Sequence, residues 1–525
     1  MDTSKLNADQ KALLAGLEKR AAQNLDRGLT AKALQQQSSY LQDCEQQLIN
    51  LMSIPQLPPL ADGNIEFGLV LYGIQKYLPT WISGLFPAPK IRDAMLQQWN
   101  DQLQKDGPVA MDDGTLVGYD LWEVMDRGWL FPFVLRLLQT SIGEKVYLQV
   151  PIHPFGSNPY SATIQQDSLK IALMGDWGTG IWNDNNTQGP AAQILKQIQV
   201  IAPDILVHLG DVYYSGTSIN LPFGVNAFML FVASTLNDSS GWKGWNKVVY
   251  DINEENDRLV MSWSSPAPKQ SLTLNSNHEM YSGANGYFPA LTAAPFAQQN
   301  ATSYFMLIFQ DWVILGLDSA YFSPDFLYMN GRLQSAANQS QVTWIQGLVS
   351  SGKLKNKKVI VLTHHNGLTF DGFPVPGYKP LESDKPQPNL YDDLSGALGR
   401  DPDYWYWGHI HNGIVYTKNI SLSPSKQTAT LCRCLGHGAL PFGSAYHWLK
   451  NQSGKEEKYP LGKMLTGPNP NIAYYAQTLL QNPPPPAPPL NRVKNGFAVL
   501  TLKAGSIKEE VYEQGTSTPV WTSGA

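Results

Sequence analysis

The sequence predicts an α/β protein, because two apolar runs that resemble buried strands enclose an amphipathic helix, and further short apolar runs follow. Residues 170–174 (KIALM) and 204–209 (DILVHL) have the length and the apolar character of strands buried on both faces. Between them, Pro190 opens a helix with apolar residues at 194, 195, 198 and 201, and Pro203 ends it. A strand–helix–strand unit of this kind implies two parallel strands in one sheet.

Further strands and helices are expected downstream of this unit. The candidate strands are residues 271–274, 305–309, 312–317, 358–362 and 404–407, with a closing hairpin of residues 496–502 and 506–512. A helix near residues 342–348 precedes the strand at 358. Residues 367–402 and 443–490 are rich in Gly, Pro and Asp, and we expect long loops there.

The N-terminal third differs in character from the rest of the chain. Residues 4–52 are expected to be mostly helical, because Leu34, Leu41 and Leu48 recur every seven residues. The domains expected are an N-terminal helical segment (1–60), an accessory region (61–165) and a catalytic domain (166–515).

Composition excludes several classes of protein. Of the 525 residues, 43% are hydrophobic and 15% are charged, the opposite of the balance in disordered chains. A formal net charge of −5 provides no basic field for nucleic acid, so we expect no nucleic-acid partner.

Neither a membrane span nor a signal peptide is expected. The most apolar window, residues 67–87, is interrupted by Gln75, Lys76 and Pro79, which favours burial over a transmembrane helix and leaves contact with a membrane surface as the weaker alternative. The polar first residues (MDTSKLNADQ) do not resemble a signal peptide. A cytoplasmic location is therefore the default expectation, with export by a non-classical route left open.

Residues typical of metal ligands follow five of the expected strands. They are Asp176, Asp211, Asn277 with His278, His364 with His365, and His409 with His411. Ligands of α/β sheets bind beyond the carboxyl ends of the strands, so these side chains are expected to meet in one crevice. Five of the nine histidines belong to these segments, which favours a metal site over helix caps and structural histidines.

The same segments carry a family resemblance. The blocks GDWG (175–178), GDVYY (210–214), NHE (277–279), VLTH (361–364) and GHIH (408–411) resemble the metallophosphoesterase (calcineurin-like) superfamily, and most closely the purple acid phosphatase pattern. The resemblance covers about residues 166–515. It implies a four-layer α/β/β/α sandwich, in which two mixed sheets lie face to face with helices outside.

The resemblance also implies a ligand set for two metal ions. Asp211 would bridge the ions; Asp176 and His411 would hold the first, and Asn277, His364 and His409 the second. A shared carboxylate relieves the repulsion between two cations, while neutral imidazoles keep them electrophilic.

The first metal is expected to have an unusual ligand. Most of the superfamily has a histidine where this chain has Gly178, and in purple acid phosphatases the tyrosine corresponding to Tyr214 completes the set. A tyrosinate favours Fe(III), which would be paired with divalent Fe, Zn or Mn. The alternative is that Tyr214 is ordinary aromatic packing and that both ions are divalent.

Two further residues are expected to assist the reaction. The resemblance makes His278 the group that stabilises the phosphoryl group or protonates the departing oxygen, with Glu279 holding its other nitrogen. His365 is expected to have a structural or supporting role. His437, in a glycine-rich stretch, is expected to be structural rather than to touch substrate.

The function expected is that of a dinuclear hydrolase of phosphoesters, preferably phosphomonoesters of phosphorylated small molecules, using a hydroxide held between the metals. One alternative is a phosphodiesterase or nucleotide hydrolase that uses the same site. Another, of a different class, is an inactive binding or scaffold protein that acts through its N-terminal helices.

Overall fold

A computed structural model gives the fold of the chain from residue 159 onward. It describes residues 159–179, 190–218, 253–263 and 270–523, the last range with short gaps of which 440–447, 459–469 and 482–489 are the longest. Before residue 159 it describes only two short paired strands, β1 (Val109–Ala110) and β2 (Leu116–Val117). The predicted helices of residues 4–52 and the apolar window 67–87 lie outside the described residues.

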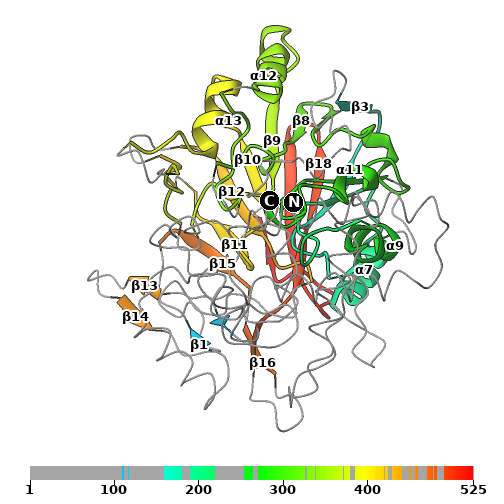
Figure 1. Cartoon of the computed structure of the whole chain (residues 1–525), viewed down its shortest axis with the longest axis vertical. Coiled ribbons are helices and arrows are strands. Elements are labelled where there is room, and N and C mark those ends of the chain that lie inside the picture. Colours follow the sequence, from blue (N-terminus) through cyan, green and yellow to red (C-terminus); the bar gives the residue numbers. More distant parts are fainter. Residues whose placement is uncertain are drawn as a thin grey trace, which may run out of the picture.

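Two mixed sheets form the centre of the molecule (Figure 1). The eight-stranded sheet has the order β15 (Ile472–Tyr475), β11 (Gly413–Tyr416), β12 (Leu431–Leu435), β10 (Tyr404–Trp407), β9 (Lys358–Thr363), β8 (Trp312–Gly316), β7 (Phe305–Phe309) and β3 (Tyr160–Ile164). The six-stranded sheet has the order β20 (Trp521–Thr522), β19 (Ser506–Glu513), β18 (Gly496–Lys503), β4 (Leu169–Met174), β5 (Ile205–His208) and β6 (Gln270–Thr273).

The remaining elements are short hairpins and helices. The hairpins pair β13 (Trp448–Lys450) with β14 (Glu456–Lys458), and β16 (Thr478–Gln481) with β17 (Leu490–Val493). The longer helices are α7 (Pro190–Ile201), α12 (Ser340–Ser350) and α13 (Leu390–Leu398). The short ones are η2 (Glu255–Val260), α9 (Met261–Trp263), α10 (Asn277–Met280), α11 (Tyr287–Ala290) and η3 (Ala297–Gln299).

The strand–helix–strand unit predicted from the sequence is confirmed. Strands β4 and β5 are parallel neighbours joined through α7, and β6 continues the parallel run on the other side of β5. The predicted hairpin closes the sheet, because β18 pairs antiparallel with both β4 and β19. Strands β8, β9, β10 and β12 form a second parallel run in the other sheet.

Hydrophobic cores separate the layers. One core lies between the sheets and takes alternate residues from both, such as Ile171 and Leu173 of β4 and Ile360 and Leu362 of β9. The opposite residues of these strands face outward, toward helices. Period-two alternation therefore places an apolar face on each side of each sheet.

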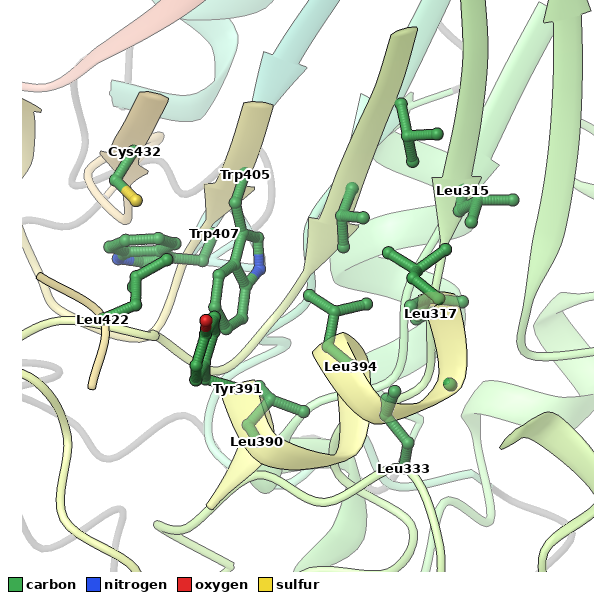
Figure 2. Close-up of a cluster of buried hydrophobic side chains, with 14 of the residues drawn as sticks. Leu315, Leu317, Leu333, Leu390, Tyr391, Leu394, Trp405, Trp407, Leu422 and Cys432 are labelled. Carbon is green, nitrogen blue, oxygen red and sulfur yellow. The ribbon is translucent and has the colours of Figure 1, made fainter. Parts of the chain in front are cut away.

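Helices cover both outer faces. Helices α12 and α13 pack against the eight-stranded sheet, where Leu390 and Leu394 of α13 approach Trp405 and Trp407 (Figure 2). Helix α7 and the helical segment η2–α9, through Leu259 and Trp263, cover the six-stranded sheet. The four-layer α/β/β/α sandwich is therefore confirmed. No helix among the described residues has the length and apolar character needed to cross a membrane.

Both expectations of long loops are wrong. Residues 443–490 contain the strands β13, β14, β15 and β16, and β15 forms an edge of the eight-stranded sheet. Residues 367–402, predicted as a long loop, contain α13, which begins at a capping box and ends at a left-handed glycine. The Asn389 side chain accepts the Asp392 amide, the Asp392 side chain accepts the Asn389 amide, and Gly399 has φ +68°. The helix forms because these caps satisfy its ends and its apolar face is buried on the sheet.

A buried ion pair joins the two sheets. Arg433 of β12 contacts Glu509 of β19 in a bidentate pair, with both N–O distances at 2.8 Å, and the Tyr406 hydroxyl donates to Glu509 at 2.7 Å. Both charged residues are at most 5% exposed. Each charge is therefore stable in the core only while its partner is present.

Replacing Arg433 with Met should lower the free energy of unfolding by about 3–5 kcal/mol, because Glu509 would remain buried without a counter-ion. Denaturant unfolding measures this loss. The exposed pair Lys508–Glu510 is the control, since Lys508→Ala should change the free energy of unfolding by less than about 1 kcal/mol. Equal losses in the two variants would contradict the assigned role of the buried pair.

Candidate metal centre

The predicted ligand residues lie at the carboxyl ends of strands from both sheets. Asp176, Asp211 and Asn277 follow β4, β5 and β6 of the six-stranded sheet. The histidines come from the facing sheet, His364 after β9 and the His409–His411 segment after β10. The structure therefore brings the predicted set together at one end of the sandwich, as expected for ligands beyond strand ends.

Close backbone contacts hold these strand ends together. An added Cβ at Gly175 would lie 2.9 Å from the Gly408 Cα, so the two strand ends can approach only as glycines. Asp176 and Asp211 have φ of +58° and +78°, and the Asp176 amide donates to the Gly210 carbonyl at 2.9 Å. These left-handed turns are uncommon for residues other than glycine and are typical of functional sites.

The first group of potential ligand atoms surrounds His411. Its Nε2 lies 3.4 Å from Asp176 Oδ1 and 3.9 Å from Asp211 Oδ2. The Tyr213 hydroxyl lies 2.8 Å from the same nitrogen and 3.5 Å from Asp211 Oδ2. Atoms that each lie about 2.0–2.2 Å from one ion are spaced in this way.

The second group surrounds Asn277. Its Oδ1 lies 2.7 Å from His364 Nε2 and 3.1 Å from His409 Nδ1. The other oxygen of Asp211, Oδ1, lies 3.2 Å from His364 Nε2. Asp211 therefore presents one oxygen to each group, which is the arrangement of a bridging carboxylate.

The hydrogen bonding of His364 leaves a lone pair facing these oxygens. Its Nδ1 lies 2.9 Å from the Leu209 carbonyl, which can only accept, so Nδ1 carries the proton of the neutral ring. Burial lowers the pKa of His364 well below its usual value, which keeps the ring neutral. Its Nε2 therefore has no proton and faces two other hydrogen-bond acceptors, Asn277 Oδ1 and Asp211 Oδ1. A cation between these atoms would remove their mutual repulsion.

The carboxylates show the same need for a cation. Asp176 and Asp211 are fully buried, and Oδ1 of each has no hydrogen-bond donor. Burial raises the pKa of Asp176 to about 7 and, together with the charge of Asp176, raises that of Asp211 well above its usual value. Two cations would remove this electrostatic penalty, so the residues present fit a dinuclear metal site.

The histidines are neutral ligands in this environment. Burial lowers the pKa of His411 to about 4 and that of His278 to about 3. The pKa of His409 is lowered well below its usual value, first by burial and then by the neighbouring histidines. No proton therefore needs to leave these rings for a metal to bind near neutral pH.

Gly178 explains why a histidine is missing from the first group. The Gly178 amide donates to the Asp211 carbonyl at 3.0 Å, and an added Cβ would lie 2.1 Å from that oxygen. Any side chain at this position would therefore collide with the backbone that carries Asp211.

The tyrosine that reaches the first group is Tyr213 rather than the predicted Tyr214. The Tyr214 ring lies beside the guanidinium of Arg258, 5.8 Å from its centre, and its amide donates to Glu254 at 2.8 Å. Those contacts, from a segment some 40 residues further along the chain, orient Tyr214 and leave the hydroxyl of Tyr213 beside His411. Sequence reasoning missed Tyr213 because the two tyrosines are adjacent in an irregular loop.

His278 enters the site as predicted, but Glu279 does not hold it. His278 Nδ1 lies 2.8 Å from the Tyr214 carbonyl, and its Nε2 faces Asp211 Oδ2 at 3.6 Å. Glu279 instead accepts a hydrogen bond from the hydroxyl of Ser276, the N-cap of α10. On this short helix the two neighbouring side chains point in different directions, which prevents their contact.

Two other histidines have structural surroundings. His365 uses both ring nitrogens, with Ser319 Oγ at 2.9 Å and the Tyr328 carbonyl at 2.6 Å, and its ring supports that of His409. His437 is fully buried, and a Cβ added at Gly413 would lie 2.3 Å from its Nε2. Both placements agree with the structural roles expected.

Comparison with known proteins identifies a family for part of the chain. The model of the calcineurin-like phosphoesterase family matches residues 169–413. No curated protein matches the chain.

Several solved structures share similarity at low sequence identity. A purple acid phosphatase from yellow lupin seeds (Lupinus luteus) has a TM-score of 0.36 and 16% identity over 68% of this chain and 53% of its own. A Plasmodium protein described as the anchor in the inner membrane complex has a TM-score of 0.35 and 13% identity, over 68% of this chain and 88% of its own. A dimetal phosphatase from Danio rerio has a TM-score of 0.32 and 11% identity, over 70% of this chain and 99% of its own. The chain thus spans about half the length of the lupin protein.

Replacing Gly210 with Ala should reduce the metal content of the purified protein. The residue has φ +102°, and an added Cβ would lie 2.7 Å from Ser276 Cβ and 2.8 Å from His364 Nδ1, so His364 would be displaced. Gly515→Ala is the matched control, since φ is +81° and nothing lies within 4 Å of its Cβ position. Elemental analysis should show loss of metal only in the Gly210 variant. Equal metal content in the two variants would contradict the assigned role of the contact between position 210 and His364.

Proposed function

We propose that this chain, whose residues 169–413 belong to the calcineurin-like phosphoesterase family, hydrolyses phosphomonoesters at a dinuclear metal centre. The family match confirms the superfamily and the enzyme class, a metallophosphoesterase, that the sequence motifs indicated. The finer proposal is supported above all by Asp211, whose two oxygens face two separate groups of potential ligands.

Each group would hold one ion. Asp176, Asp211, His411 and Tyr213 would hold the first, and Asp211, Asn277, His364 and His409 the second. We favour Fe(III) for the first ion, because a phenolate oxygen is a ligand for a hard trivalent ion, with divalent Fe, Zn or Mn as the second. When bound, such a pair neutralises phosphate oxygens and activates water at neutral pH.

His278 is the protein group best placed to act on the substrate. Its Nδ1 is anchored on the Tyr214 carbonyl, and its ring lies between those of Tyr213 and Tyr281, with centres 4.4 Å and 5.2 Å away. These contacts direct Nε2 toward the side where a phosphoryl group would contact the metals. In the neutral ring Nε2 carries no proton, because burial lowers the pKa of His278 to about 3. An anionic phosphoryl group beside it would have to favour protonation before Nε2 donates to a phosphoryl oxygen or to the departing oxygen.

A terminal phosphate suits this setting better than a diester. The His278 and Asn277 side chains are buried, and 18% of the His411 side chain is exposed. A substrate would therefore present one small anionic end to the metals. A diester would need room for two substituents beside the same buried groups.

Hydrolysis of p-nitrophenyl phosphate by metal-loaded protein should exceed that of bis-p-nitrophenyl phosphate. His278→Ala should lower kcat for the monoester by about 10²–10⁴-fold, while metal content stays at the wild-type level. A preference for the diester would favour the phosphodiesterase alternative. If the loaded protein cleaves neither ester, a binding or scaffold role replaces the enzyme proposal. Loss of metal from the variant would make His278 a ligand instead.

Tyr213→Phe should abolish the visible absorption band of an iron–phenolate bond, whereas Tyr214→Phe should retain it. The reason is that the hydroxyl beside His411 and Asp211 belongs to Tyr213. Absorption spectra of the iron-loaded variants distinguish the two residues. Loss of the band in the Tyr214 variant would restore the ligand expected from the sequence motif. A colourless wild type with two divalent ions would contradict the iron assignment.

A further inference from the structure

The side-chain amide of Asn277 has two ends, and only its oxygen can bind a metal ion. In the structure the oxygen is the inward atom, with Oδ1 at 2.7 Å from His364 Nε2 and 3.1 Å from His409 Nδ1. Rotation of the amide by half a turn would exchange Oδ1 and Nδ2 with little change in shape. The amide can therefore serve as a ligand only where its surroundings distinguish the two ends.

The inward contact with His364 favours the wrong end when no ion is bound. His364 Nδ1 donates to the Leu209 carbonyl, so its Nε2 can only accept. An inward Nδ2 could donate to that nitrogen, whereas the inward Oδ1 meets it as a second acceptor. Hydrogen bonding at this end thus favours the rotated amide, which would present an NH₂ group to the metal.

The outward contacts favour the correct end. Asn277 Nδ2 lies 3.1 Å from the Tyr281 hydroxyl and 3.9 Å from Met329 Sδ. A thioether sulfur can only accept a hydrogen bond, so it favours the NH₂ group over the carbonyl oxygen. The Tyr281 hydroxyl lies 4.0 Å from the same sulfur and can donate to it while accepting from Nδ2. Both neighbours therefore favour an outward nitrogen and an inward oxygen.

The two outward residues are held in place by the fold. Tyr281 follows α10, and its amide donates to the Asn277 carbonyl at 3.1 Å, so the two side chains lie one helical turn apart on the same face. Met329 follows Tyr328, whose carbonyl accepts a hydrogen bond from His365 Nε2 at 2.6 Å. His365 thus fixes the backbone that carries the sulfur.

We propose that Tyr281 and Met329 hold the Asn277 amide with its oxygen toward the second metal position before an ion binds. They are positioning residues, because they act through Asn277. The inference rests on the dinuclear centre proposed above. Without the Tyr281 hydroxyl, the amide could rotate and donate to His364, and an incoming ion would have to displace that hydrogen bond. Outer partners of metal ligands typically change metal affinity by about 10–100-fold.

The test is a calorimetric titration of the metal-free, full-length protein with Mn²⁺. We expect two ions to bind the wild type, and Tyr281→Phe to weaken one of them by about 10–100-fold while the other binds as before. The phenylalanine keeps the ring that contacts His278 and removes only the hydroxyl. The matched control is Tyr391→Phe, which removes a hydroxyl bonded to Asp401 on the outer face of the eight-stranded sheet. This control should bind both ions as the wild type does.

Asn277→Asp distinguishes orientation from packing. A carboxylate has two oxygens, so its rotation exchanges equivalent atoms and needs no orienting partner. Tyr281→Phe should therefore cause no further loss of affinity when it is added to Asn277→Asp. Equal losses in the two backgrounds would show that the hydroxyl supports packing, and the proposal would fail.

Met329→Leu gives an independent variant, because it removes the sulfur at nearly equal volume. It should weaken the same ion as Tyr281→Phe. If both variants bind two ions as tightly as the wild type, the amide needs no outward partners and the proposal is wrong. A wild type that binds fewer than two Mn²⁺ ions would overturn the dinuclear centre itself. Binding is measured without substrate, so the outcome is separate from the preference for phosphomonoesters.

Discussion

The structure depends on one electrostatic constraint: a buried carboxylate, Asp211, faces histidine nitrogens that cannot donate to it. The Nδ1–H group of His364 donates to the Leu209 carbonyl, so the lone pair of its Nε2 faces Asp211 Oδ1 and Asn277 Oδ1. Without cations, these hydrogen-bond acceptors would repel one another in a buried region of low dielectric constant, which would destabilise the fold. The three hydrophobic cores and the Arg433–Glu509 pair must therefore hold together an end of the sandwich that would otherwise repel itself. Metal binding would convert this repulsion into attraction and would couple the stability of the fold to metal loading.

Glycine makes this close arrangement possible. The ligands come from strands of two different sheets, so the strand ends must approach until backbone touches backbone. Gly175 against Gly408 and Gly210 against His364 allow that approach where any Cβ would collide. The site is therefore defined as much by these missing side chains as by the ligands, which is why the sequence blocks pair a glycine with each aspartate and with His409.

The sequence predicted the fold well where local pattern and burial agree. The parallel unit around α7, the strands at 305–309 and 404–407 and the closing hairpin were recognisable from period and turn signals, because their side chains alternate between two apolar layers. Helix α13 was missed although its capping box is local, since glycine and proline nearby suggested a loop. The inward turn of Tyr213 could not be predicted, because no period governs an irregular loop and Arg258, which orients Tyr214, is distant in sequence. The same holds for His278, whose partner is a backbone carbonyl 64 residues away.

Gly178 and Tyr213 together suggest why the two metal positions would differ. Gly178 packs directly against the backbone of Asp211, so a histidine at position 178 would collide with it and cannot serve as a ligand of the first metal position. Tyr213 faces it from the other loop, which gives that position three oxygen donors and one nitrogen, whereas the second has imidazoles at His364 and His409. Oxygen anions favour a hard, highly charged ion, and neutral imidazoles favour a borderline divalent one. An asymmetry of charge across the bridging carboxylate would therefore follow from the loss of one side chain at position 178.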